Sequence, residues 1–139
     1  FRSTKCRKEL TDKLSTWKGL VEDKQKKIRN YKFNFIIENA VNYNGYMSDK
    51  IFECFYSGTV PIYLGAKNIQ SFIPKECFID FSEFEDMSQL HDYLINLDQN
   101  SYDLYIHNIQ NFLKNKNTIF SFDYFNQVIF DSLCSLLKK

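Results

Sequence analysis

The sequence predicts an α/β domain in which a parallel sheet lies under helices. Three short apolar segments, at 33–37, 60–64 and 77–81, have the composition of strands. The first segment is apolar except for one Asn. Such a nearly continuous apolar run is typical of a parallel strand that is buried on both faces. A helical pattern separates the first two strands, and a short helical turn at 68–72 precedes the third. Right-handed crossovers then give a βαβ arrangement.

Two helices are predicted before the first strand. Over residues 3–17, apolar side chains recur every three or four positions, and Gly19 interrupts the pattern. This stripe consists of Cys6, Leu10, Leu14 and Trp17. Residues 22–30 form a second, very polar helical pattern in which Lys and Arg cluster. That basic run is either a solvated face or a surface that attracts phosphates.

The helix between the first two strands has recognisable ends. Asn42 to Gly45 has turn composition, Ser48 offers an N-cap, and Gly58 ends the helix. The apolar stripe between them consists of Ile51, Phe52, Phe55 and Tyr56. In the next strand, Pro61 lacks an N–H group and argues against a central position in the sheet, unless it lies at the strand start.

From residue 86 onward the pattern is helical. Three apolar stripes recur at helical spacing, and we interpret them as packing faces rather than ligand-binding surfaces. They are Met87, Leu90, Leu94 and Leu97, then Tyr102, Ile106, Ile109 and Leu113, and last Phe125, Val128, Ile129, Leu133 and Leu136. A polar break at 115–118 separates the second stripe from the third.

Length and composition indicate one globular domain. The chain has 139 residues, 44% of them hydrophobic and 17% aromatic, which argues against extensive disorder. The 18 basic and 17 acidic residues nearly balance, so a nucleic-acid-binding role is not expected. No apolar run approaches the roughly 18–20 residues of a membrane span. Because the chain starts with Phe1 rather than Met, we expect a longer protein whose N-terminal segment could carry an anchor or targeting signal.

The residue types that usually hold metals are scattered. The four cysteines show no Cys-x-x-Cys spacing, and the two histidines lack nearby ligand partners in the sequence. We interpret Cys54 and Cys77 as small core residues, although the sequence leaves disulfides open. His91 and His107 are interpreted as helix-surface residues. The sequence therefore predicts no metal site and no cofactor.

The loop after the first strand carries the residues best suited to chemistry. It contains Glu38, Asn39, Tyr46, Asp49 and Lys50 within a dozen positions, and it leads into a helix N-terminus. Ligands bind beyond the carboxyl ends of parallel strands, and anions bind at helix N-termini. These residue types suit a nucleotide diphosphate. A cation and amide groups can bind its phosphates, a carboxylate can accept hydrogen bonds from its ribose hydroxyls, and an aromatic ring can pack against it.

Two alternatives for Lys50 remain at this point. Its side chain could extend into solvent, or it could pair with Glu53 three positions later. The sequence contains no G-x-G-x-x-G, Walker A or Asp-x-Asp motif. The negative charge of a diphosphate would therefore have to be stabilised by Lys50, an arginine and the amides of the helix. The residues alone predict a nucleotide- or phosphate-binding α/β domain.

The stretch from Tyr31 to Phe81 resembles the donor-binding half of the α-1,3-fucosyltransferases, glycosyltransferase family 10. The matching segments read YKFNFIIEN, GYMSDKIFECF, SGTVPIYLG, IP and FI, and the resemblance extends from about Trp17 to about Phe130. It implies a Rossmann-like domain that is one half of a GT-B fold, with flanking helices and a helical C-terminal segment. It also implies an inverting enzyme that transfers fucose from GDP-fucose to a GlcNAc or glucose unit of an acceptor glycan.

The resemblance also implies roles for individual residues. Lys50 matches a lysine that contacts the diphosphate, and Asp49 stands where the family has a glutamate that holds ribose hydroxyls. Tyr46 matches the tyrosine of the GY motif beside the nucleotide. Asn39 and Glu38 match an EN pair, with Asn39 near the phosphates and Glu38 near the sugar. Two further donor-binding residues are Ser48, which replaces a threonine and keeps the hydroxyl, and Arg7, which matches a phosphate-binding arginine through a looser motif.

The chain also departs from the family pattern. We expect residues 1–139 to form the GDP-fucose-binding domain, shortened near 13–18, where the family has an additional strand and loop. The family's N-terminal acceptor domain is absent, and with it the carboxylate expected to act as general base. No catalytic residue is therefore assigned within this chain, which is expected to be inactive alone.

Two other functions remain open from the sequence. The chain could be a catalytically silent nucleotide-binding remnant or interaction module, or a transferase that uses another nucleotide sugar. The expected location is the cytoplasm or a membrane periphery if the source is microbial or viral, or the Golgi lumen as part of a membrane-anchored protein. The sequence does not determine the acceptor or the oligomeric state.

Overall fold

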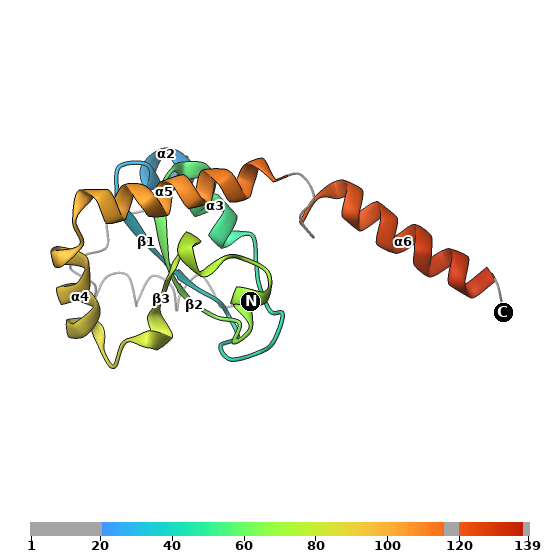
Figure 1. Ribbon diagram of the computed structural model, residues 1–139, viewed down its shortest axis with the longest axis horizontal. Helices are drawn as coiled ribbons and strands as arrows, with labels where there is room; N and C mark the ends of the chain where they lie inside the picture. Colours follow the sequence, from blue (N-terminus) through green and yellow to red (C-terminus); the bar gives the residue numbers. More distant parts are fainter. Residues whose placement is uncertain (1–20, 116–119, 138–139) are drawn as a thin grey trace.

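The computed structural model describes residues 21–115 and 120–137. Its centre is a parallel sheet of β1 (Phe33–Ile37), β2 (Val60–Leu64) and β3 (Ile79–Asp80), in the order β1-β2-β3 (Figure 1). Phe35 pairs with Ile62, and Ile62 pairs with Ile79. The predicted α/β fold with a parallel sheet is therefore confirmed. The helix expected over 3–17 and the shortened segment near 13–18 lie outside the described residues.

The polar helix before the sheet forms, over a shorter range than predicted. α2 (Lys24–Ile28) begins after Asp23, whose carboxylate caps the Lys26 N–H at 2.9 Å. Lys24 forms an ion pair with Glu53 on the neighbouring helix α3 (Lys50–Ser57). Lys24, one member of the basic cluster, therefore pairs with an acidic side chain of the protein itself.

Helix α3 connects β1 to β2 and buries the expected side. Ile51, Cys54 and Phe55 are buried, and the helix ends at Gly58, which adopts the left-handed conformation at φ 71°. The predicted N-cap is wrong, because Asp49 occupies that position and the helix begins at Lys50. The hydroxyl of Ser48 is directed instead to the carboxylate of Glu38.

Pro61 lies in the central strand, which the sequence argued against. The N–H of Val60 donates to the carbonyl of Lys32 on the β1 side. The next nitrogen along a strand faces the opposite neighbour, and pairing with β3 starts only at Ile62. Pro61 therefore sits near the strand start, at a place where no ladder hydrogen bond is required.

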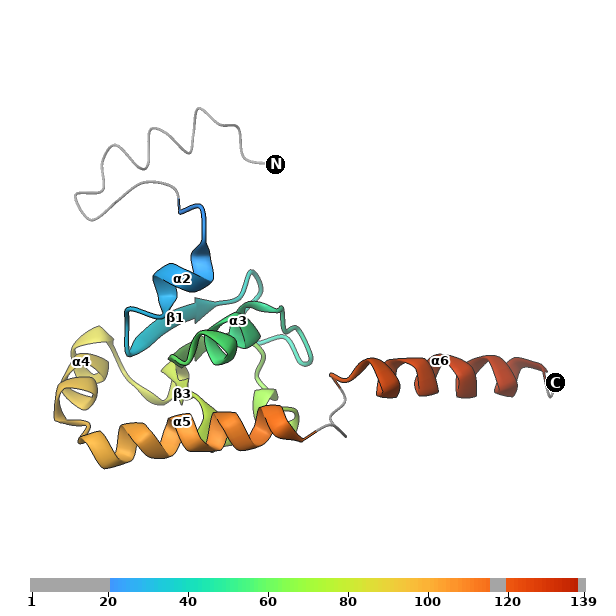
Figure 2. The same ribbon diagram turned by 90° about the horizontal axis from the view of Figure 1, so that it is seen from above.

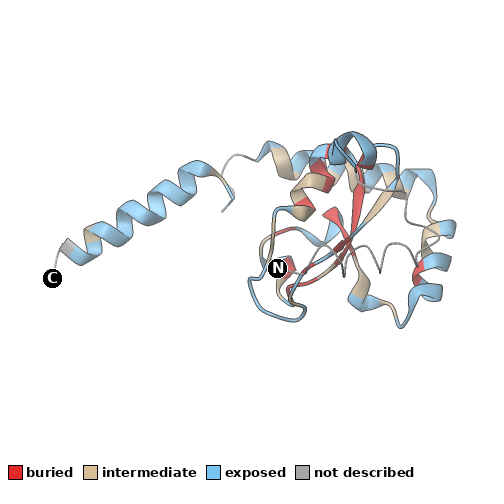
Figure 3. Ribbon diagram, turned by 180° about the vertical axis from the view of Figure 1, so that it is seen from behind, coloured by how far each residue is buried: buried red, intermediate tan, exposed pale blue. Residues whose placement is uncertain are grey.

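The expectation that β1 is buried on both faces is wrong. Ile36 is buried, whereas Phe35 is 42% exposed and Ile37 is 56% exposed. Across the domain, buried positions concentrate in the central strands, and the surrounding helices and loops are mostly exposed or intermediate (Figure 3). Side chains two positions apart share a face of a strand, so one face of β1 is open towards its end. Within the described residues β1 is also an edge strand, because it pairs only with β2. An apolar run indicates which residues can be buried, not which neighbour covers them.

The third strand is shorter than predicted. It is preceded by the 3₁₀ turns Ile69–Ser71 and Lys75–Cys77 and followed by Phe81–Glu83. Cys54 and Cys77 are both buried free thiols, which confirms their prediction as core residues. Burial raises the pKa of the Cys77 thiol to about 11, so that it stays protonated at neutral pH.

Two helices follow the sheet as the apolar stripes predicted. α4 (Met87–Asn96) and α5 (Gln99–Lys114) begin after Asp86 and Asp98, and each acid caps an N–H of the first turn. Leu90 of α4 and Ile109 of α5 are buried in the core. Phe112 near the end of α5 packs edge-on against Phe55 of α3.

The last helix, α6 (Phe122–Leu137), extends away from the body of the molecule (Figures 1 and 2). Its predicted packing face exists as a stripe on the helix, but the side chains are exposed, so its assignment as a packing face is wrong for the described structure. The exposed members are Phe125, Val128, Ile129, Leu133 and Leu136. Among the described residues, no helix has both the length and the apolar character needed to cross a membrane.

Candidate functional site

The candidate site lies where β1 ends and α3 begins. Glu38 directly follows β1, and its N–H extends the ladder by donating to the carbonyl of Leu64 at 2.9 Å. The Glu38 side chain turns inward and has 0% of its surface exposed. A buried carboxylate needs hydrogen-bond donors, and the chain that returns through Ser48 and Lys50 supplies them.

Three donors reach this carboxylate, which are the Ser48 N–H, the Ser48 hydroxyl and the Lys50 ammonium. The Ser48 N–H donates to Oε1 at 2.9 Å, and the Ser48 hydroxyl lies 3.0 Å from Oε1 and 2.8 Å from Oε2. The Lys50 ammonium donates to Oε2 at 3.2 Å and to the carbonyl of Ile37 at 3.0 Å. The end of the strand and the start of the helix are thereby fastened to each other.

The electrostatics of Glu38 follow from these contacts. Burial by itself raises the pKa of the carboxyl, but the hydrogen bonds from Ser48 and the nearby Lys50 ammonium outweigh it, so the pKa lies below its usual value of 4.5. Glu38 is therefore ionised at neutral pH and forms an ion pair with Lys50.

The tip of α3 is open to an anion. The N-cap residue Asp49 makes no capping hydrogen bond with its side chain, and the Lys50 N–H has only a long 3.4 Å contact to the Ser48 hydroxyl. Unpaired first-turn amides and the helix dipole favour negative charge at such an end. The Lys50 side chain is 30% exposed, so its positive charge is partly accessible to solvent near the tip of α3.

The loop between β1 and α3 is held by the neighbouring strand and turn. The N–H of Asn42 donates to the carbonyl of Gly65 at 2.8 Å, and the N–H of Gly45 donates to the Asn68 side chain at 2.7 Å. Asn42 and Gly45 have positive φ values of 66° and 74°, as the turn composition predicted. Tyr46 follows with an exposed ring.

Gly65, at the end of β2, gives Glu38 the space it occupies. A Cβ atom on Gly65 would lie 2.6 Å from Glu38 Cγ and 2.6 Å from Tyr63 Cζ, and closer still to the Tyr63 hydroxyl. The Tyr63 hydroxyl accepts from the Ala66 N–H at 3.0 Å, so its ring is held in place. Only glycine fits this close approach.

Replacing Gly65 by alanine should therefore destabilise the fold. We expect a loss of about 1–3 kcal/mol in the free energy of unfolding, because the buried Glu38 and Tyr63 side chains must both move. Urea unfolding followed by circular dichroism measures this change. A loss below about 0.5 kcal/mol, the usual range for surface substitutions, would contradict the close approach.

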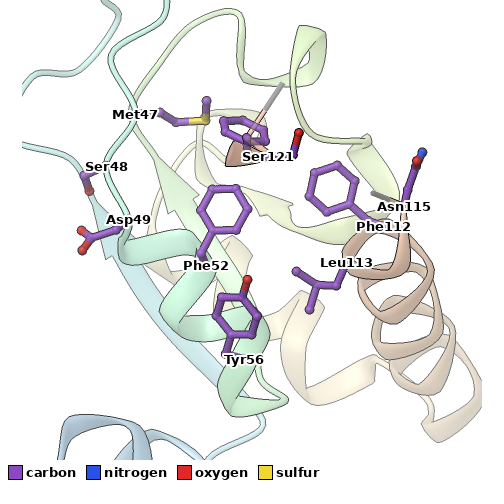
Figure 4. A pocket seen from close by; sticks show the side chains of 10 residues that line it. Met47, Ser48, Asp49, Phe52, Tyr56, Phe112, Leu113, Asn115 and Ser121 are labelled. Carbon is purple, nitrogen blue, oxygen red and sulfur yellow. The ribbon is translucent and has the colours of Figure 1, made fainter. Parts of the chain in front are cut away.

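An open cavity of about 520 Å³ lies beside the tip of α3 (Figure 4). Ser48 and Asp49 line it from the helix tip, together with the aromatic residues Phe52, Phe112 and Phe120. The ring centroids of Phe52 and Phe120 are 4.9 Å apart, and those of Phe112 and Phe120 are 6.5 Å apart. No local pattern in the sequence predicts this cluster, because its rings come from segments about sixty residues apart.

Metal-binding residues do not gather in the described part of the chain. No group of three or more His, Cys, Asp or Glu side chains there is arranged to hold a metal ion. His91 and His107 are exposed on α4 and α5, as the sequence predicted.

The structure brings together three of the seven predicted donor-binding residues, Glu38, Ser48 and Lys50. Asn39, Tyr46 and Asp49 flank this cluster with exposed side chains. Arg7 lies outside the described residues. The alternative pair between Lys50 and Glu53 does not form, because Lys50 pairs with Glu38 and Glu53 pairs with Lys24. Contact of these residues with a donor stays a prediction.

Comparison with known proteins gives one consistent family. The family model described as "Glycosyltransferase family 10 (fucosyltransferase) C-term" matches residues 6–139. An alpha-(1,4)-fucosyltransferase of Arabidopsis thaliana is 44% identical over 64 residues, 46% of this chain and 16% of that protein. The alpha-(1,3)-fucosyltransferase FucT of Helicobacter pylori is 31% identical over 74 residues, 53% of this chain and 15% of that protein.

Solved structures agree with this result. A crystal structure of alpha1,3-fucosyltransferase with GDP-fucose superimposes with a TM-score of 0.59 at 28% identity, over 66% of this chain and 28% of that chain. The same kind of enzyme with GDP gives a TM-score of 0.58 at 26% identity, again over 66% of this chain and 28% of that chain. The chain thus spans less than a third of the length of each of these proteins.

Proposed function

The chain belongs to glycosyltransferase family 10, and we propose that it is the GDP-fucose-binding domain of an inverting α-1,3-fucosyltransferase. The acceptor would be a GlcNAc or glucose unit of a glycan. The main support is the tip of α3, where the N-cap side chain of Asp49 caps no amide and the Lys50 ammonium is held at the adjoining end of β1. An anionic diphosphate suits that combination.

In the proposed reaction an acceptor hydroxyl attacks the anomeric carbon of fucose in line. A new bond forms from the acceptor oxygen to that carbon, the bond from the carbon to the β-phosphate oxygen breaks, and GDP departs with the bonding electrons. The hydroxyl proton passes to a base that the acceptor domain would supply. Lys50 and the α3 amides stabilise the charge that develops on GDP.

Calorimetry followed by a transfer assay tests the proposal. Titration of the chain with GDP-fucose should show binding, and competition with GDP-mannose and UDP-sugars should show a preference for the fucose donor. Absence of any binding to GDP or GDP-fucose would overturn the proposal. A transfer assay with an N-acetyllactosamine acceptor then separates a transferase from the alternative, a catalytically silent nucleotide-binding module, which would bind without turnover.

Replacing Asp49 by glutamate should leave GDP-fucose affinity equal or better. The exposed carboxylate of Asp49 stands at the tip of α3, and glutamate restores one methylene of length towards ribose hydroxyls. Calorimetric comparison of the variant with the wild type measures the dissociation constant. A marked loss of affinity would mean that the ribose lies elsewhere.

A further inference from the structure

We propose that Glu38 is a positioning residue, which sets the direction of the Lys50 ammonium from inside the fold without touching the donor. The inference rests on the proposed function, because it gives Glu38 a part in the same diphosphate site. Family resemblance predicts a place beside the sugar for this residue. The geometry points to a different part.

The Glu38 carboxylate is not accessible to a ligand in this arrangement. Its side chain is fully buried, and its two oxygens accept from three donors, which are the Ser48 N–H, the Ser48 hydroxyl and the Lys50 ammonium. These internal donors occupy most of the roughly four lone-pair positions of a carboxylate, and burial closes the rest to solvent. Sugar hydroxyls would have to displace internal partners to reach it.

The Lys50 ammonium, in contrast, keeps one donor. An ammonium group has three N–H bonds, and two of them are directed to the Ile37 carbonyl and to Glu38 Oε2. The two acceptors come from the end of β1, so they fix the nitrogen relative to the sheet. The remaining N–H belongs to a side chain that is 30% exposed, and it is available to a phosphate oxygen.

The negative charge of Glu38 and its hold on Lys50 have opposite effects on GDP affinity, so a substitution can distinguish them. A buried carboxylate repels a nearby diphosphate, so its charge alone weakens binding. Replacing Glu38 by the neutral, isosteric glutamine would then tighten GDP binding if charge were the whole effect. If Glu38 acts by holding Lys50, the same replacement weakens binding, because the amide is a poorer acceptor and the ammonium is no longer held.

Calorimetry with GDP on the full chain forms the first test, using Glu38→Gln, Lys50→Ala and the double variant. We expect Glu38→Gln to weaken GDP binding about tenfold, the scale of a charged hydrogen bond. The double variant should bind within about twofold of Lys50→Ala, because Glu38 acts through that side chain. Binding that is tighter or unchanged in Glu38→Gln, or losses that multiply in the double variant, would overturn the inference.

Glu53→Gln is the matched control. Glu53 lies on the same helix and pairs with the exposed Lys24, so its replacement removes one carboxylate and one ion pair without affecting Lys50. GDP affinity should stay within about twofold of the wild type. A loss as large as that in Glu38→Gln would show a general effect of charge on α3 and overturn the inference.

A ligand-free measurement separates this inference from the proposed function. Acetylation of Lys50 with a soluble acetylating reagent, followed by mass spectrometry, reports how freely its nitrogen moves. Relative to the exposed Lys67, the Lys50 rate should rise about fivefold in Glu38→Gln, the scale of about 1 kcal/mol. An unchanged rate overturns the positioning role alone, whereas a wild type that binds no GDP overturns the proposed function and the role of Glu38 in a diphosphate site.

Discussion

Replacing Lys50 by alanine should weaken GDP-fucose binding by about 1.5–3 kcal/mol, the range for a hydrogen bond to a charged group. The Lys50 ammonium is the cation held at the carboxyl end of β1, and it is part of the tip of α3. Within the described part of the candidate site, its removal leaves the backbone amides of the α3 tip to meet the diphosphate. Isothermal titration with GDP-fucose measures the change, which corresponds to roughly 10- to 150-fold in the dissociation constant.

The matched control for this prediction is Lys24→Ala. Lys24 carries the same charge and contacts the same helix, but it pairs with Glu53 in an exposed ion pair. Its replacement should change affinity less than about twofold, because exposed pairs contribute little. Equal losses in the two variants would mean that only overall charge matters, and an unchanged Lys50→Ala would remove Lys50 from the diphosphate site.

Replacing Glu38 by alanine should lower the free energy of unfolding by about 2–3 kcal/mol. The Ser48 N–H and hydroxyl lose their buried acceptor, and the removed side chain leaves a gap against Gly65 and Tyr63. Lys50 contributes less, because its partly exposed ammonium can turn into water. Urea unfolding measures the loss, and Glu53→Ala, which breaks an exposed pair, should cost below about 1 kcal/mol.

The same carboxylate predicts a pH dependence with a definite sign. The pKa of Glu38 is lower in the folded chain than its usual value of 4.5, so the folded state binds fewer protons there than the unfolded state. Its contribution to stability is fully present above about pH 4.5 and is lost as the pH falls through the lowered pKa. Stability should therefore fall less steeply in acid for Glu38→Gln than for the wild type. Equal slopes would contradict the lowered pKa.

Much of the fold was predictable because its signals are local. The strand 33–37, the end of α3 at Gly58 and the apolar stripes of α4 and α5 each depend on residues within a few positions of one another. The N-cap of α3 was missed for a non-local reason, since the Ser48 hydroxyl makes its short contacts with Glu38, ten residues earlier, and only a long one with the helix. The exposure of Ile37 was missed because an apolar run does not specify its neighbours.

The candidate site was predicted in composition but not in arrangement. The sequence indicated that Glu38, Ser48 and Lys50 lie near one helix tip, and the structure places them in one hydrogen-bonded cluster. The inward direction of Glu38 had no local signal, because it depends on the space above Gly65, twenty-seven positions later. The contact of Phe120 with Phe52 likewise had no local signal, because the two rings come from distant segments of the sequence.

By itself, the amino-acid sequence determined the order of helices and strands, the family to which the chain belongs, and the residue types at the tip of α3. Tertiary structure alone decided that Glu38 is buried rather than presented to solvent, that Lys50 pairs with it rather than with Glu53, and that the stripe on α6 is exposed. The physical reason is range. Backbone preferences and side-chain periodicity act over a few residues, whereas a buried ion pair depends on which distant segments the sheet register brings together.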